Sequence, residues 1–196
     1  MGDAILKTIE AYESFSEEDM KDYFDFEGVR CFAEFFRENL NGRNVLDVGC
    51  GPGRDAKYFS ENGLDVTGID LADNFLTIAS RMAPKAQFIS MDMRKLDFAD
   101  SSFDGAWINS SFLHIPKKES KSTLSELKRI LKPDGLMFLA VKEGKEECFV
   151  DSRFYAFYER NELKSLLDSS GLKIIKFDCI ENRGIKWICV FCQKNI

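Results

Sequence analysis

Residues 45–55 read Val45-Leu46-Asp47-Val48-Gly49-Cys50-Gly51-Pro52-Gly53-Arg54-Asp55, and this stretch decides the fold of the chain. An apolar strand pattern runs into a glycine-rich turn, and a helical pattern follows directly. Glycines let the chain turn tightly and bring backbone N–H groups close to a ligand. The N-terminus of the following helix favours negative charge. The stretch therefore predicts a strand–loop–helix ligand site.

Strands and helices alternate around this loop. The apolar patterns predict strands at residues 44–48, 65–69, 86–90, 104–109, 136–142, 172–180 and 185–192, and helices at 54–62, 72–82, 117–131 and 159–170. Such alternation is typical of a parallel sheet with helices on both faces. The last two strands are joined by only four residues, which is too short for a parallel crossover, so they must form an antiparallel hairpin. We predict an α/β, Rossmann-like fold, with a doubly wound, mainly parallel seven-stranded sheet closed by an antiparallel C-terminal hairpin.

Composition excludes several classes of protein. The net charge is −6 and the pI is about 5.0, so we expect no general attraction to nucleic acid or to an anionic membrane. No apolar run approaches the roughly 20 residues of a membrane span, and the acidic N-terminus lacks the pattern of a signal peptide. We therefore expect a cytoplasmic protein.

The six cysteines favour reduced thiols, and two of them form a C-x-x-C pair, Cys189 and Cys192. That pair lies in an alternating strand pattern, where residues three apart point to opposite faces. No second Cys or His pair with ligand spacing accompanies it. We therefore predict no metal site.

The spacing of the glycines separates two kinds of nucleotide site. A dinucleotide loop reads G-x-G-x-x-G, whereas this loop reads G-x-G-x-G and has Arg54 where the third dinucleotide glycine belongs. An acidic residue, Asp47, also stands two positions before the first glycine. A NAD-dependent oxidoreductase is therefore disfavoured.

The run LDVGCGPGRD resembles motif I of the class I S-adenosylmethionine-dependent methyltransferases. The resemblance continues through GIDLADNFLTIA, FISMDMRKLDFADSSFDGAW and LKRILKPDGLMFLAV, covers roughly residues 44–142, and is weaker at FYERNELKSLLDSSGLKII. It is strongest to small bacterial-type enzymes that act on small molecules, of the methyltransferase-11 and -25 type. It implies one methyltransferase domain over residues 1–196, with an N-terminal helical cap at 1–43, a cofactor-binding core at 44–142 and a substrate-side segment, helix and hairpin at 143–196.

The resemblance also implies roles for the residues around the loop. Asp47 would lie under the methionine tail of S-adenosylmethionine, Gly49 and Gly51 would give the close backbone approach, and Gly53 would relax the turn before the helix. Asp70, at the end of the second strand, would accept hydrogen bonds from the ribose hydroxyls. The alternative for Asp70 is a cap for the helix that starts near residue 72.

Four further positions complete the implied cofactor site. Leu71 and Met93 would contact the adenine ring, Asp92 would accept from the adenine amino group, and Asn109 would lie near the sulfur. The alternative for Asp92 is a solvent-exposed loop residue. These residues follow the carboxyl ends of parallel strands, where ligands bind in open α/β sheets.

Acceptor contacts are harder to assign. His114, the only histidine, follows the fourth strand and is a candidate for acceptor contact or for a general base; otherwise it is a packed loop residue. Tyr12 lies in a segment similar to the family's N-terminal helix over the site, although simple helix packing explains it as well. Arg153 either holds an anionic acceptor or is a surface arginine.

The sequence therefore predicts S-adenosylmethionine-dependent methyl transfer, most simply to a small molecule. Two alternatives stay open, namely a non-catalytic cofactor-binding partner of another methyltransferase and an enzyme acting on tRNA or protein. Transfer from a sulfonium needs mainly alignment and removal of water, so a catalytic base is not required. The acceptor and the oligomeric state are not readable from the sequence.

Overall fold

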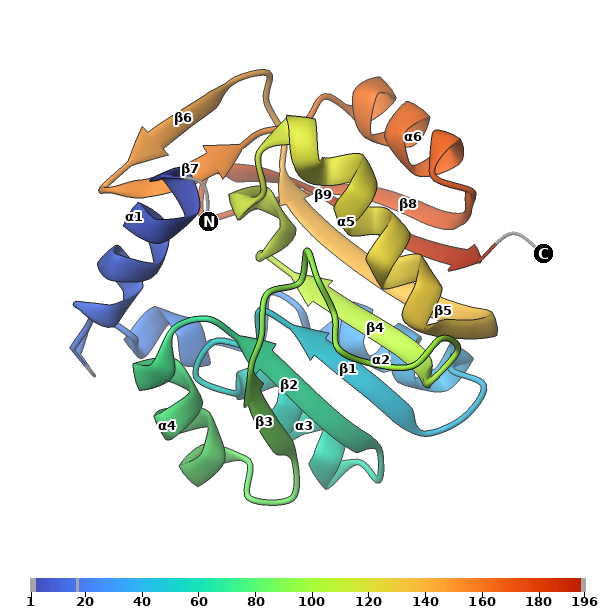
Figure 1. Ribbon diagram of the computed structural model, residues 1–196, viewed down its shortest axis with the longest axis horizontal. Helices are drawn as coiled ribbons and strands as arrows, with labels where there is room; N and C mark the ends of the chain where they lie inside the picture. The colour runs from blue at the N-terminus through green and yellow to red at the C-terminus, as the bar shows by residue number, and fades with distance from the viewer. Residues whose placement is uncertain (1–2, 17, 195–196) are drawn as a thin grey trace.

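A seven-stranded sheet forms the centre of the protein (Figure 1). The computed structural model describes residues 3–16 and 18–194. The strand order is β3-β2-β1-β4-β5-β9-β8, with β1 to β5 parallel and β9 antiparallel to both of its neighbours. The strands are β1 (Asn44–Val48), β2 (Asp65–Asp70), β3 (Gln87–Ser90), β4 (Phe103–Asn109), β5 (Leu131–Lys142), β8 (Leu172–Asn182) and β9 (Ile185–Lys194). The predicted fold is thus confirmed.

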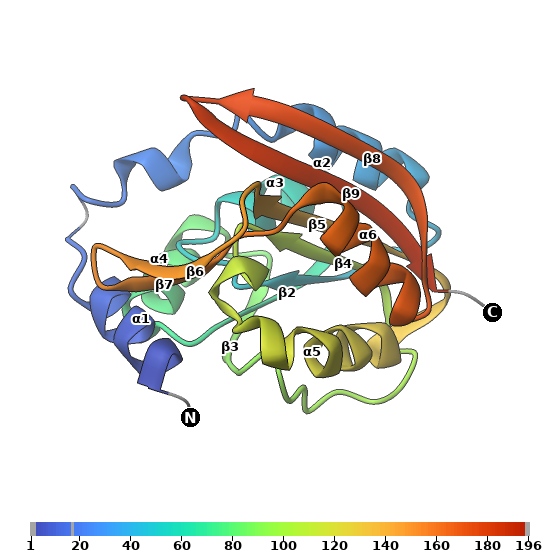
Figure 2. The same cartoon turned by 90° about the horizontal axis from the view of Figure 1, so that it is seen from above.

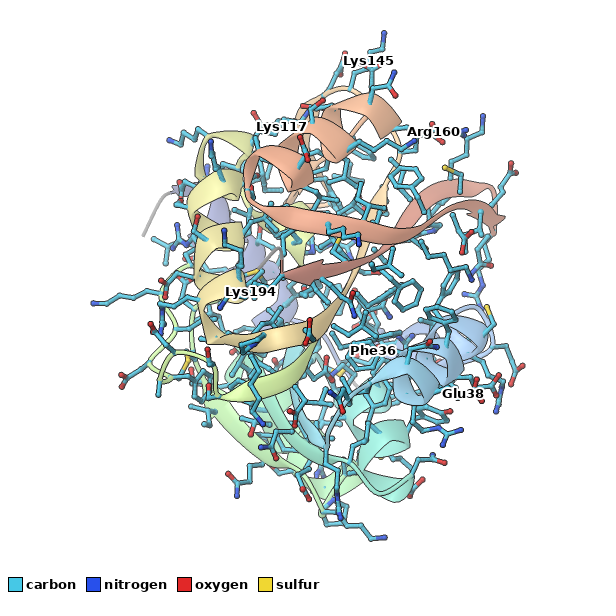
Figure 3. The ribbon with its side chains drawn as sticks, turned by 90° about the vertical axis from the view of Figure 1, so that its right-hand side faces the viewer. Phe36, Glu38, Lys117, Lys145, Arg160 and Lys194 are labelled. Atoms are coloured by element: carbon cyan, nitrogen blue, oxygen red, sulfur yellow. The ribbon has the colours of Figure 1, made fainter. Side chains whose placement is uncertain are left out.

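Helices cover both faces of the sheet (Figures 1 and 2). They are α1 (Asp3–Glu13), α2 (Arg30–Asn39), α3 (Arg54–Glu61), α4 (Asp73–Met82), α5 (Lys117–Ile130) and α6 (Arg160–Ser169). One core cluster contains α2 and α3 with Trp107 of β4, and the other contains α5 and α6. In Figure 3, Phe36 points from α2 toward the sheet while Glu38 points outward, as the amphipathic pattern of this helix requires.

The two cysteines of the C-x-x-C pair point to opposite faces of strand β9. Cys189 packs in the core cluster on the α2 side, and Cys192 packs in the cluster on the opposite face. All six cysteines are free thiols. Within the described residues, no group of three His, Cys, Asp or Glu side chains is arranged to hold a metal ion.

The predicted N-terminal helical cap is partly wrong. Residues 1–43 are not continuously helical, because turns separate α1, the 3-10 helix η1 (Lys21–Phe24) and α2. Helix α1 and η1 lie at the end of the sheet, where Tyr12 packs against Tyr23, whereas α2 packs against a sheet face through Phe32 and Phe36. Met1, Gly2 and Glu17 lie outside the described residues.

Two other features depart from the sequence-based expectation. A second sheet, the hairpin of β6 (Glu147–Val150) and β7 (Arg153–Ala156), was not predicted; it packs beside α1 (Figures 1 and 2). Strand β5 also begins at Leu131 instead of residue 136, because Leu131 already pairs with Phe103 across a register shift. The hairpin β6–β7 and residues 131–135 at the start of β5 show no clear alternation of apolar and polar residues.

Parallel strands β1, β2 and β4 end at the same edge of the sheet, and the loops that follow them meet there. The hairpin β6–β7 and α1 also lie at this edge. The described chain contains no helix long and apolar enough to cross a bilayer.

Candidate active site

A cavity of about 490 Å³ opens at the carboxyl ends of the parallel strands. Its wall includes eleven of the residues singled out from the sequence: Tyr12, Asp47, Gly49, Gly51, Asp70, Leu71, Asp92, Met93, Asn109, His114 and Arg153. Gly53 is absent from the lining. An ideal Cβ on Gly53 would meet Ala79 at 2.8 Å, so this glycine lets the loop pack against α4.

Asp70 connects the glycine loop to the second strand. Its Oδ2 accepts a hydrogen bond from the Gly51 backbone N–H at 2.9 Å, and its Oδ1 accepts from the N–H groups of Leu71 and Ala72 at 2.8 and 3.0 Å. Burial raises the pKa of Asp70, and these backbone donors oppose that rise. The carboxylate therefore has a fixed orientation and also supports the turn into α4.

Gly51 leaves free space in the loop. Its φ is +52°, a left-handed conformation that suits glycine, and an added Cβ would meet no atom within 4 Å. At Gly49, by contrast, a Cβ would lie 2.3 Å from the Cβ of Ser111, so this glycine allows the loops after β1 and β4 to approach. The opening at Gly51 is a cradle that a ligand can enter.

Two buried carboxyls beneath the loop differ sharply in their partners. Asp55 accepts from Trp107 Nε1 at 2.7 Å and Asn109 Nδ2 at 2.9 Å, and it forms an ion pair with Arg54. Burial opposes ionisation of Asp55, but the charge of Arg54 and these hydrogen bonds hold its pKa below the ordinary value.

Asp47 is only 2% exposed, and its Oδ2 has no hydrogen-bond partner among the described residues. Burial, and then the negative charge of Asp55, raise the pKa of Asp47 well above its ordinary value. A buried carboxyl with a free oxygen on a cavity wall is suited to a cationic ligand group.

Asp92 borders the cavity after β3, but its carboxylate is already bound. Arg94 donates to Oδ1 and Oδ2 through Nε and Nη2, and it also pairs with Glu119 at 2.6 Å. Burial opposes ionisation, but the hydrogen bonds from Arg94 lower the pKa of Asp92. Asp92 is thus partly buried and paired with Arg94, a partner that no sequence pattern predicts.

His114 and Tyr12 come together across 102 residues of sequence. His114 Nδ1 lies 2.6 Å from the Phe154 carbonyl oxygen, and Nε2 lies 2.8 Å from the Tyr12 hydroxyl. A carbonyl can only accept, so Nδ1 carries the proton and Nε2 accepts from Tyr12. Burial lowers the pKa of His114 to about 4, so the ring is neutral at pH 7.

Arg153, on β7, covers the same aromatic residues. Its guanidinium carbon lies 5.6 Å from the Tyr12 ring centroid and 5.8 Å from that of Tyr155. Nη1 donates to the Tyr23 hydroxyl at 3.2 Å, while the buried Nε has no partner among the described residues. Arg153 is therefore not an ordinary surface arginine.

Comparisons with known proteins extend these observations. A family model described as a methyltransferase domain matches residues 45–135. The O-methyltransferase rstn1 of Aspergillus nomiae is 28% identical over 160 residues, which are 74% of this chain and 70% of that protein. The demethylmenaquinone methyltransferase of Renibacterium salmoninarum is 35% identical over 99 residues, which are 50% of this chain and 41% of the relative. Over residues 45–135, which hold the glycine loop and strands β1 to β4, the chain is therefore similar to methyltransferase domains.

A solved structure has the same fold as this chain. The 1,6-didemethyltoxoflavin-N1-methyltransferase of Burkholderia thailandensis, crystallised with 1,6-didemethyltoxoflavin and S-adenosylhomocysteine, superposes with a TM-score of 0.81. The alignment covers 98% of this chain and 88% of that one, at 24% sequence identity.

The cavity of this chain fits S-adenosylmethionine chemically. The cofactor carries an ammonium group and a sulfonium, both positive, and the loop end of the cavity presents the orphan oxygen of Asp47 and the carboxylate of Asp70. The open space at Gly51 admits a group close to the backbone. The residues present therefore suit the group that the family uses.

Sequence reasoning missed several residues that shape the site. Asp55 follows the glycine loop directly, and its place at a helix N-terminus was the available signal. Ser111 donates to the Val48 carbonyl at 2.5 Å, and Lys142 ends β5 at the cavity wall. For Lys142, the position at a strand end was the only signal in the sequence.

Proposed function

We propose that this chain transfers the methyl group of S-adenosylmethionine to a small-molecule acceptor bound between Tyr12, His114 and Arg153. The observation that carries the proposal is the unpartnered, buried oxygen of Asp47 beside the open glycine loop. The curated relatives named above, a fungal O-methyltransferase and a bacterial quinone methyltransferase, support a small acceptor. The cavity volume of about 490 Å³ suits a ligand of that size.

Each cofactor-side residue has a role in this proposal. Asp47 binds the ammonium group of the methionine tail, and the backbone at Gly49 and Gly51 lies against that tail. Asp70 accepts from a ribose hydroxyl with the Oδ2 lone pair that its three backbone donors leave free. When bound, S-adenosylmethionine supplies a methyl group on a positively charged sulfur.

The adenine and sulfur contacts follow the same logic. Leu71 and Met93 provide apolar contacts to the adenine ring, and Asp92, oriented by Arg94, accepts from the adenine amino group. Asn109 donates a hydrogen bond from its side-chain amide to Asp55. Its role near the sulfur is therefore mainly to position Asp55. Gly53 acts indirectly, by letting the loop close on α4.

On the acceptor side, His114 orients Tyr12 and does not remove a proton. A pKa of about 4 makes it a weak base, and both ring nitrogens are occupied. Helix α1 and strand β7 meet here, because Phe154 donates its N–H to Thr8 of α1 at 2.9 Å and offers its carbonyl to His114. Together these contacts exclude water from the acceptor.

The test is transfer of label from methyl-labelled S-adenosylmethionine into a cell extract that has been separated into small-molecule, RNA and protein fractions. We expect label in the small-molecule fraction, and at least about tenfold less with Asp70→Ala. Label in RNA or protein would favour a macromolecular acceptor. Cofactor binding without transfer to any fraction would favour a non-catalytic partner. Unchanged kcat/KM for the identified acceptor after His114→Ala would remove His114 from the site.

A cytoplasmic location is part of the same proposal. The six free thiols support a reducing compartment. The acidic composition supports an acceptor other than nucleic acid.

A further inference from the structure

The two ends of the cavity carry opposite charge. The loop end holds the carboxyls of Asp47, Asp70 and Asp92; in the proposed function Asp47 binds the ammonium group of the cofactor, and the other two accept hydrogen bonds from its ribose and adenine. At the far end, the wall includes the cationic side chains of Lys142 and Arg153.

Lys142 lies inside the aromatic wall without an anionic partner. Its ammonium is 4.2 Å from the Tyr155 ring centroid and 5.7 Å from that of Trp187. The lysine pairs with Trp187 across β5 and β9, so the sheet fixes its position. It forms no ion pair with any described residue, and burial lowers its pKa, as does the charge of Arg153.

Arg153 is the second cation at this end, and its charge is only weakly compensated. Among the described residues its one ion-pair partner, Asp151, is 83% exposed and lies 3.8 Å away. Such an exposed pair contributes little. Arg153 and Lys142 both lie over the Tyr155 ring, so the two positive charges are close together.

The groups around this pair leave an excess of positive charge. His114 is neutral and packs 4.9 Å from Tyr155, and the Tyr12 hydroxyl bonds to it. Asp25 also lines the cavity, but it is paired with Arg183 at 2.9 Å. Two desolvated cations without an equal counter-charge favour a bound anion.

We propose that Lys142 and Arg153 select an acceptor that binds as an anion on a planar, aromatic-type ring, such as a phenolate, enolate or ring carboxylate. The inference rests on the proposed function and adds the substrate class and Lys142 as a specificity residue. Trp187, which lines the cavity and is only partly buried, provides a surface for the ring.

This acceptor class explains why the site needs no general base. An anionic oxygen forms its bond to the methyl carbon while the carbon–sulfur bond breaks, and the electron pair of that bond stays on sulfur. The negative and positive charges cancel, and the products are a methyl ether or ester and a neutral thioether. No proton has to be removed in the site, in agreement with a neutral, fully bonded His114.

The experiment is calorimetric titration, at pH 7.5, of the protein loaded with S-adenosylhomocysteine. The probes are 2-naphthoate, its neutral counterpart 2-naphthamide, and the cation 2-naphthylmethylamine. We expect naphthoate to bind about tenfold more tightly than the amide, and the cation to bind least. Lys142→Met should remove most of this preference, and Lys142→Arg should retain it.

A matched control is Lys164→Met, because Lys164 lies 4.4 Å from the Phe177 ring centroid but outside the cavity wall. It should keep the full preference. Equal binding of naphthoate and the amide, no measurable naphthoate binding, or a preference unchanged by Lys142→Met would overturn the inference. Tight binding of S-adenosylhomocysteine in those cases would leave the proposed function intact, whereas its absence would remove the proposed function itself.

Discussion

Asp70 accepts a hydrogen bond from the backbone N–H of Gly51 at 2.9 Å, across the gap between β2 and the loop after β1. Two neighbouring strand ends are thereby joined by one carboxylate. The same carboxylate fixes the start of α4 through the N–H groups of Leu71 and Ala72. Hydrogen bonds therefore hold the proposed cofactor cradle in place before any ligand binds, and this lowers the entropic cost of binding.

Asp47→Asn should stabilise the unliganded protein near neutral pH and weaken cofactor binding by about tenfold or more. The raised pKa of Asp47 means that its contribution to stability is present at acid pH and is lost as the pH rises through the folded-state value. Asparagine stays neutral and avoids that loss. In thermal unfolding, the melting temperature of Asp47→Asn should exceed that of wild type by more at pH 8 than at pH 5. A variant that is less stable at both pH values, with unchanged cofactor affinity, would contradict this account.

Asp55→Ala should destabilise the fold by about 3 kcal/mol, because it leaves the buried donors of Trp107 and Asn109 without an acceptor and Arg54 without its ion pair. Urea unfolding measures the loss. Glu61→Ala is the matched control on the same helix, since the Glu61–Lys57 pair is exposed and should cost about 0.5 kcal/mol or less. A loss at Asp55 no larger than at Glu61 would show that this network is not structural.

His114→Gln should reduce the stability that the protein loses as the pH falls. The pKa of His114 is lowered from 6.5 to about 4 by burial, so the wild-type protein loses stability as the pH falls from about 6.5 toward 4. Lys142 and Arg153 face the ring and add to this loss by opposing a further positive charge. Urea unfolding at pH 7 and pH 4.5 should give a smaller difference for the variant than for wild type. Equal differences would mean that His114 titrates near its ordinary value.

The parts of the fold that were predictable share one property, a regular pattern over many residues. The glycine loop, the parallel strands and the C-terminal hairpin could all be read from periodicity and loop length. The hairpin β6–β7 has only four residues in each strand, which is too short for a period to show. The break between α1 and α2 was missed because the segment between them is rich in residues that helices also contain.

Some residues of the candidate site were predictable from local patterns and others were not. Residues at strand ends, such as Asp47 and Asp70, were predictable because parallel strands finish at one edge. The pairing of Tyr12 with His114 depends on a contact over 102 residues, and the cationic end depends on β5 meeting β7. No local pattern carries such information. Arg94 was missed because no sequence pattern shows that its side chain pairs with Asp92 two residues earlier.

Calorimetric titration of the purified protein with S-adenosylhomocysteine, with NAD as the comparison ligand, tests the central claim most directly. Wild type and Asp65→Ala, an exposed change at the opposite end of β2, should bind S-adenosylhomocysteine tightly and NAD not measurably. Asp70→Ala should lose about tenfold to a hundredfold in affinity, because the ribose loses its charged acceptor. Tight NAD binding, no binding of S-adenosylhomocysteine by wild type, or an Asp70→Ala affinity equal to that of Asp65→Ala would contradict the account.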